Sequence, residues 1–179
     1  MSEIPTSSSQ KSAFHGPKIA IIATIAYIAA SPGQTYGVSL FVESWMADLE
    51  LTRSEISTLY TLATIAGGLS MPTIGRLVDR MGPKTVTLAV SLGLGVGLSI
   101  VSFANGVLAL FVGVFWLRLF GQGAFGLCAS NITARWYNRR RGKIVGMTLA
   151  AASLVTAFYP AAVELLISNF GWRKSLLIL

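Results

Sequence analysis

The feature that most constrains this chain is a series of apolar stretches long enough to cross a lipid bilayer. A spanning helix needs about 20 apolar residues, because the hydrocarbon core is about 30 Å thick. The stretches near that length are 18–42, 56–75, 85–103, 107–132 and 144–168. They lack the strict apolar–polar alternation of barrel strands. The sequence therefore predicts an all-α membrane protein with five transmembrane helices.

The two ends of the chain differ from this apolar body. Residues 1–17 are polar and contain three consecutive serines, so we predict a disordered cytoplasmic tail. A secretory signal is the alternative, because Lys18 precedes an apolar run that ends in small residues. The last stretch, from about residue 175, is too short to span and is interpreted as the start of a sixth helix. Residues 18–179 are thus predicted to form a partial transmembrane domain.

The charged residues indicate the orientation in the membrane. The net charge of +7 is compatible with nucleic-acid binding. However, the bases lie in short segments between apolar stretches, which is the topology signal of membrane proteins. One set of segments holds ten bases, Lys11, Lys18, Arg76, Arg80, Lys84, Arg135, Arg139, Arg140, Arg141 and Lys143, and the opposite set holds three, Arg53, Arg173 and Lys174. We expect a multi-pass protein of the cell (inner) membrane with a cytoplasmic N-terminus, an external 43–55 loop and no nucleic-acid partner.

The segment between the second and third stretches carries the most specific motif. It reads Gly-Arg-Leu-Val-Asp-Arg-Met-Gly-Pro-Lys over residues 75–84. We expect Gly75 to allow two helices to approach closely and Gly82 to allow a tight turn. Asp79 is expected to accept hydrogen bonds from nearby bases or to lie at a helix N-terminus.

This segment resembles the signature of the major facilitator superfamily, G-x-L-x-D-R-x-G-x-K, at every fixed position. The resemblance implies a twelve-helix transporter built from two six-helix halves, of which this chain would supply most of the first. It also implies that Gly75, Asp79, Arg80, Gly82 and Lys84 form a conformational motif that stabilises the outward-facing state. An ordinary basic cytoplasmic loop is the alternative.

Arg118 lies near the middle of the fourth stretch. An arginine at that depth costs about 2.5–3.5 kcal/mol even on lenient insertion scales, so it normally faces a water-filled cavity or a partner. We predict that Arg118 binds substrate, because a guanidinium can pair with a carboxylate. A buried pair with a carboxylate in the missing half is the alternative. The position also resembles the family's fourth-helix pattern, R-x-x-Q-G-x-G, except that Gly121 replaces Gln, and Gln122 and Gly123 come one place late.

The first stretch is interrupted at Ser31-Pro32-Gly33, which predicts a kinked helix. Broken helices line the substrate path in transporters, so we predict that Gln34 and Tyr36 also bind substrate. Hydrogen bonds to neighbouring helices are an equally weighted alternative. Three sets of small residues predict close helix packing: Ala29, Gly33 and Gly37; Gly93 and Gly97; and Gly142, Gly146 and Ala150.

Three softer features resemble the branch that holds the oxalate–formate antiporter and the monocarboxylate transporters. They are the aromatic and basic run before Gly142, Pro160 in the fifth stretch, and the Gly-Trp-Arg sequence at 171–173. The resemblance implies an antiporter or symporter of a small organic anion such as a monocarboxylate. Glu164 is a candidate coupling carboxylate, but a solvated position near the helix end is the favoured interpretation.

Other classes of function remain as alternatives. One alternative is a non-functional fragment, and another is an assembly subunit that pairs with another chain through its small-residue faces. An enzyme is not expected, because no nucleophile–base–orienter set can be placed. His15 and Cys128 are the sole histidine and cysteine, so no metal site is expected, and no cofactor is predicted. The expected partners are the anion, the lipid bilayer and the second half of the transporter.

Overall fold

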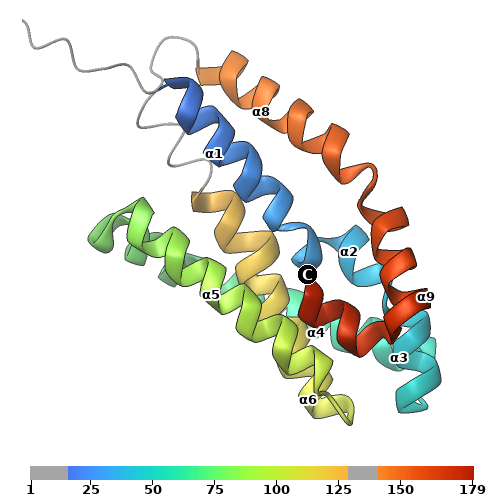
Figure 1. Cartoon of the computed structure of the whole chain (residues 1–179). Helices are drawn as coiled ribbons and strands as arrows, with labels where there is room; N and C mark the ends of the chain where they lie inside the picture. Colours follow the sequence, from blue (N-terminus) through green and yellow to red (C-terminus); the bar gives the residue numbers. More distant parts are fainter. Residues whose placement is uncertain (1–15, 129–140) are drawn as a thin grey trace, which may run out of the picture.

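The computed structural model describes residues 16–128 and 141–179, and these residues form helices without any β-strand (Figure 1). The first part of the chain contains α1 (Gly16–Ala29), the 3-10 turn η1 (Ser31–Gly33), α2 (Thr35–Ser39) and α3 (Val42–Leu49). The long helices α4 (Arg53–Met81) and α5 (Pro83–Ser102) follow. The remainder contains α6 (Val107–Leu117), the π-helix η2 (Arg118–Ala124), α8 (Arg141–Thr156) and α9 (Tyr159–Ile178). The all-α prediction is confirmed for the described residues.

The predicted interruption of the first stretch is confirmed. α1 ends at Ala29, and Pro32 and Gly33 form η1 before the chain resumes as α2. Proline has no N–H group to continue the helical hydrogen bonds, which explains the break. The prediction of a loop at 43–55 is largely wrong, because α3 covers most of its first half and α4 begins at Arg53. The actual turn is short and contains Glu50 in the left-handed conformation, with φ of 54°.

Helix α4 begins with a capping box. The Thr52 hydroxyl accepts a hydrogen bond from the Glu55 backbone N–H at 3.3 Å, and the Glu55 carboxylate accepts one from the Thr52 backbone N–H at 2.8 Å. Two N–H groups that lack helical partners are thereby satisfied. The helix then continues through most of the 75–84 motif, so the prediction of a loop there is wrong. The turn is concentrated at Gly82, whose φ of 81° confirms the expected role of glycine.

The last third of the described chain contains two further breaks. α8 ends at Thr156 and α9 begins at Tyr159, with Pro160 in the first turn of α9. Proline is tolerated there because the first N–H groups of a helix have no intrahelical partner. The predicted fifth stretch, 144–168, is therefore two helices rather than one. The expected boundary before a sixth helix at about 175 is also displaced, because α9 runs to Ile178 and its non-helical residue is Gly171, with φ of 75°.

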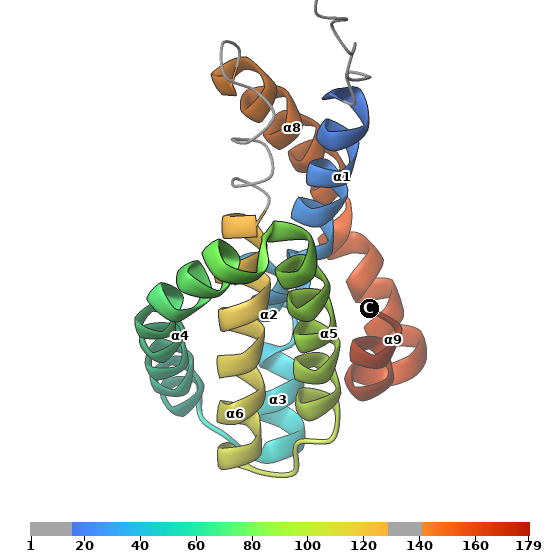
Figure 2. The same ribbon diagram turned by 90° about the vertical axis from the view of Figure 1, so that its left-hand side faces the viewer.

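The helices pack as an open bundle (Figure 2). Helix α5 packs along α6, α4 contacts both α6 and η2, and α1 packs along α8. Close packing at Gly93 and Gly97 is confirmed, because a Cβ atom at either position would lie 3.0–3.1 Å from the Phe120 or Trp116 side chain. Gly142 and Gly146 do not pack closely against any described atom, so that predicted small-residue face is not used here. The same holds for Gly75, which contradicts the close approach expected there.

Three segments of the described chain, rather than five, are both long and apolar enough to cross a membrane. They are Thr85–Ser102, Val107–Cys128 and Val145–Ile178. The first predicted stretch is excluded because its break leaves no long helix. α4 has 29 residues but includes many Ser and Thr residues, which lower its mean hydropathy. Residues 129–132 of the predicted fourth stretch lie outside the described part of the chain.

Candidate anion site at a buried arginine

Arg118 is buried where three segments of the chain meet, with 5% of its surface exposed. Its Nε donates a hydrogen bond to Thr64 Oγ1 on α4 at 3.0 Å. Its Nη1 donates to the Gly33 carbonyl oxygen of η1 at 3.1 Å and to Thr35 Oγ1 of α2 at 3.4 Å. The guanidinium also lies over the ring of Tyr60, 4.8 Å from its centroid. All these groups are neutral, so the described residues leave the positive charge without an anionic partner.

One face of α4 packs against Arg118. Tyr60, Thr64 and Gly67 are spaced i, i+4 and i+7, which places them on the same side of a helix. Gly67 has no side chain, so the Arg118 Cβ lies only 3.6 Å from the position of an added Cβ atom. The helix therefore provides an aromatic ring, a hydroxyl acceptor and space for close approach at successive turns.

The first span and the π-helix cross at a pair of glycines. A Cβ atom at Gly33 would lie 2.3 Å from the Leu117 carbonyl oxygen and 2.6 Å from Gly121 Cα. A Cβ atom at Gly121 would lie 2.6 Å from Gly33 Cα. Only glycine fits at both positions, and the close crossing brings the Gly33 carbonyl within reach of Arg118. The glycine at 121, where the related pattern has Gln, is thus explained by packing.

The π-helix also accounts for the displacement of Gln122 and Gly123 from that pattern. A π turn closes i→i+5 hydrogen bonds and so holds one residue more than an α turn. η2 begins at Arg118 and contains both displaced residues. Gln122 is exposed and does not contribute to the contacts of Arg118. Such π segments occur frequently at functional sites.

The other two predicted substrate-binding residues, Gln34 and Tyr36, lie on either side of Thr35 in the sequence, but neither forms a hydrogen bond with Arg118 in the described part of the chain. The Tyr36 hydroxyl donates a hydrogen bond to Ser31 Oγ at 3.0 Å, and its ring meets that of Tyr159 edge to face at 5.9 Å. The Tyr159 hydroxyl is buried and has no hydrogen-bond partner among the described residues. Gln34 precedes α2 and is half-buried. The structure therefore brings Thr35, rather than its two neighbours, to the arginine.

The predicted conformational motif lies far along α4 from this site. Asp79 and Arg80 are exposed near its C-terminal end, and among the described residues Asp79 forms no hydrogen bond or ion pair. Lys84 lies in the first turn of α5. Of the bases at 135–143 that were used to infer the orientation in the membrane, Arg135, Arg139 and Arg140 fall outside the described residues. Glu164 is exposed on α9.

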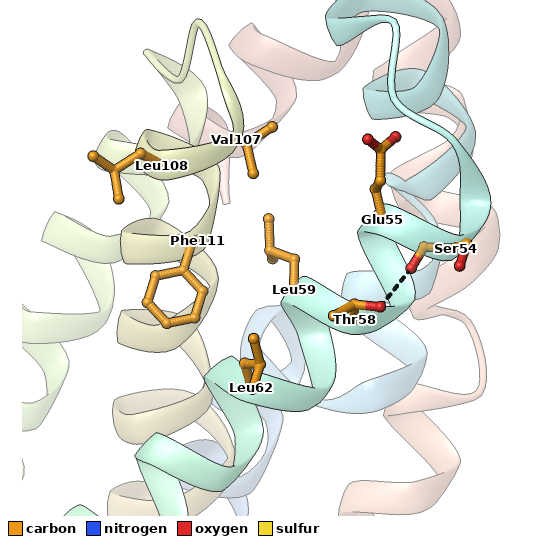
Figure 3. A pocket seen from close by; sticks show the side chains of 8 residues that line it. All are labelled: Ser54, Glu55, Thr58, Leu59, Leu62, Val107, Leu108 and Phe111. Carbon is orange, nitrogen blue, oxygen red and sulfur yellow. Dashed lines mark hydrogen bonds between the residues drawn. The ribbon is translucent and has the colours of Figure 1, made fainter.

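Two cavities differ in their suitability for an anion. The first has a volume of about 580 Å³ and lies between α4 and α6, where mostly apolar side chains line it (Figure 3). Its Thr58 hydroxyl is already bonded to the Ser54 carbonyl, and Glu55 carries a negative charge. The second, of about 290 Å³, has a mixed lining of three apolar residues, five hydroxyl-bearing residues and one base: Val38, Val42, Ile56, Thr35, Ser39, Ser57, Tyr60, Thr61 and Arg53. Arg118 does not line it, but Thr35 and Tyr60 both line it and contact Arg118, so the second cavity adjoins the arginine and is favoured for an anion.

Sequence reasoning identified Arg118 but missed Thr35, Tyr60, Thr64 and the Gly33 carbonyl. A signal was present for two of them, because Tyr60 and Thr64 share a helical face within an apolar stretch. No local signal pairs that face with Arg118, since 54 residues separate Thr64 from it. The free carbonyl of Gly33 depends on the exact position of the helix break.

A broken first span, a buried arginine at a helix crossing and long apolar helices define a multi-pass membrane protein of the secondary-transporter class. A sequence model of the Major Facilitator Superfamily matches residues 19–179, nearly the whole chain, and the protein belongs to this family. The resemblance of the 75–84 motif is thereby confirmed.

The curated relatives are transporters of that superfamily. The chain is 29% identical over 132 residues to the probable sulfoacetate transporter SauU of Cupriavidus necator, covering 74% of this chain and 31% of that protein. It is 26% identical over 163 residues to human monocarboxylate transporter 11, covering 89% of this chain and 34% of that protein. It is 24% identical over 146 residues to the uncharacterized MFS-type transporter YhjX of Escherichia coli, covering 82% and 36%. The chain spans about a third of the length of these relatives.

Proposed function

We propose that the protein is a secondary transporter of a small organic anion, such as a monocarboxylate. The observation that carries the proposal is the buried guanidinium of Arg118, which has neutral partners only among the described residues. A buried charge without a counter-ion is costly, and a bound anion relieves that cost. Relatives named as sulfoacetate and monocarboxylate transporters support this class of substrate.

The charge of the site favours a monoanion. Arg118 contributes one positive charge, and the groups around it are hydroxyls, a carbonyl and an aromatic ring. A single carboxylate or sulfonate neutralises that charge, whereas a dianion needs a second base. Arg53 lines the adjoining cavity but is already paired with Glu43. Gln34 and Tyr36 remain candidates for contacts with the rest of the substrate, on either side of Thr35.

For the whole protein, of which this chain would form part of the first half, we propose that the two halves rock around a central substrate site. The arrangement then comprises the apolar helices of this chain, a second half that completes the cavity, and Gly75, Asp79, Arg80, Gly82 and Lys84 as the conformational motif. Large exposed apolar side chains on α4 and α8–α9 support a membrane and helical surroundings; they include Leu62, Ile65, Leu69, Leu154, Phe158 and Leu165. Such a surface is stable only in lipid or against other helices.

The function is tested by uptake into proteoliposomes of radiolabelled acetate, lactate and pyruvate. Arg118→Ala is expected to abolish uptake, because it removes the positive charge that is proposed to bind the anion. Lys174→Ala, which removes an exposed base from α9, serves as the matched control and is expected to transport normally. Full uptake by Arg118→Ala would contradict the role proposed for the arginine.

The proposed topology is tested by cysteine labelling in intact cells. With Cys128 replaced by serine, Asn105→Cys in the turn between α5 and α6 is expected to react with a membrane-impermeant maleimide. Ser12→Cys in the N-terminal segment is expected to react only after the cells are opened. The reverse pattern would place the N-terminus outside the cell and overturn the orientation inferred from the bases.

A further inference from the structure

The donors of the Arg118 guanidinium are unequally used. A guanidinium has five N–H donors, one on Nε and two on each terminal nitrogen. Nε is bonded to Thr64, and Nη1 is bonded to the Gly33 carbonyl and to Thr35. Nη2 has no hydrogen-bond partner among the described residues, although the residue is 5% exposed. The two donors on Nη2 are therefore left for a ligand, and Nη2 is not among the fully buried atoms that lack a partner.

Thr35 supplies a further donor next to Arg118. Its Oγ1 accepts a hydrogen bond from the Tyr60 hydroxyl at 3.0 Å and another from Arg118 Nη1 at 3.4 Å. A hydroxyl oxygen has two lone pairs and one proton, so both lone pairs are occupied and the proton is available to donate. The Thr35 side chain is exposed and lines the cavity of about 290 Å³ that adjoins Arg118.

These two observations define the recognition of a carboxylate. We propose that Thr35 is a specificity-determining residue, whose hydroxyl donates to one carboxylate oxygen of the anion while Arg118 Nη2 donates to the other. Thr64 is a positioning residue, which fixes the guanidinium through Nε. This inference rests on the proposed function. It adds a direct substrate contact by Thr35, the residue between Gln34 and Tyr36.

The three neutral acceptors on Arg118 also limit how a carboxylate can approach the guanidinium. A bidentate fork along Nε–Nη2 or Nη1–Nη2 requires that Thr64 or Gly33 be displaced. Contact through Nη2 and the Thr35 hydroxyl leaves both of those bonds intact. The site can thus bind the ligand without breaking the link between η1, α4 and η2.

The test measures equilibrium binding of radiolabelled acetate, lactate and pyruvate to the purified full chain. Thr35→Val keeps the shape but removes the hydroxyl, and it is expected to weaken binding about tenfold, the effect of losing one hydrogen bond to a charged group. Thr35→Ser retains the hydroxyl and is expected to bind within about twofold of the original protein. Unchanged binding by Thr35→Val, or no rescue by Thr35→Ser, would overturn the proposal.

Two further variants separate recognition from structural support. If Thr35 only held Tyr60 in place, Tyr60→Phe would weaken binding as much as Thr35→Val does. We expect Tyr60→Phe to bind the anion within about threefold of the original protein, because its ring still covers Arg118.

Thr64→Val is expected to weaken binding in the original protein. It is expected to have little further effect when combined with Arg118→Lys, because the contribution of Thr64 passes through the guanidinium. If the original protein binds none of the three probes, the proposed function itself fails, whatever the variants do.

Discussion

At the scale of single residues, the site depends on where side chains are absent as much as on where they are present. Gly33 and Gly121 let η1 and η2 cross with their backbones in contact. Because of that crossing, the Gly33 carbonyl reaches Arg118 at 3.1 Å. A carbonyl freed by a broken helix and a buried guanidinium satisfy each other, which lowers the cost of both.

We expect Gly121→Ala to destabilise the protein, because its Cβ would overlap backbone atoms of Gly33 that have no side-chain freedom to move. Overpacking of this kind typically costs about 1–3 kcal/mol. The measurement is the melting temperature in detergent, with Gly95→Ala as the control, since no described atom lies within 4 Å of a Cβ there. Equal melting temperatures for the two variants would show that the crossing is looser than described.

At the scale of elements, each helix end near the site has a local cause. Pro32 breaks the first span, Gly82 closes α4 with a positive φ, and the capping box of Thr52 and Glu55 begins α4. The start of α4 matters for the site, because the same helix carries Tyr60 and Thr64 two and three turns later. Two hydrogen bonds from Thr52 lower the pKa of Glu55, which lies just before the predicted span.

The lowered pKa of Glu55 gives a prediction about pH. A carboxyl group whose pKa is depressed in the folded state stabilises the fold above its unfolded pKa, about 4.3, and this contribution is lost as the pH falls through the folded pKa. We expect the protein to melt at a higher temperature than Glu55→Gln at pH 7, with the difference shrinking as the pH falls below about 4.3 towards the lowered pKa of Glu55. A difference that persisted unchanged at pH 3 would mean that the charge of Glu55 is not what stabilises the cap.

At the scale of the whole molecule, one arginine joins three distant segments. Arg173 Nη1 donates hydrogen bonds to the carbonyl oxygens of Ser102 and Ala104, where α5 ends, at 3.0 and 2.9 Å. Its Nη2 pairs with Asp48 on α3 at 2.7 Å. The Ser102 hydroxyl in turn donates to the Arg173 carbonyl at 2.7 Å, and the guanidinium stacks on Trp172. This junction holds α3 against the end of α5 and against α9.

We expect Arg173→Ala to lower the melting temperature in detergent more than Lys174→Ala, because two carbonyl groups at the α5 terminus and Asp48 lose their donor. Asp48→Asn is expected to have a smaller effect, since the half-exposed ion pair contributes little in solvent and the carbonyl bonds remain. If Asp48→Asn were as damaging as Arg173→Ala, the ion pair rather than the carbonyl contacts would hold the junction.

Local sequence determined the main features of the chain. Apolar stretches of spanning length predicted an all-α membrane protein, Pro32 predicted the break in the first span, and the spaced residues from Gly75 to Lys84 predicted the family. Arg118 stood out because a charge within an apolar stretch is costly. Each of these inferences needs only neighbouring residues, so the sequence alone sufficed.

The tertiary structure decided everything that depends on contacts between distant segments. Thr64 lies 54 residues from Arg118 and Gly33 lies 85 residues away, and neither pairing can be read from local periodicity. The continuation of α4 through the motif and the division between α8 and α9 also differ from the predicted boundaries, because helix ends respond to packing as well as to propensity. The sequence thus determined which residue carries the charge, whereas the crossing of η1, α4 and η2 decided which groups surround it.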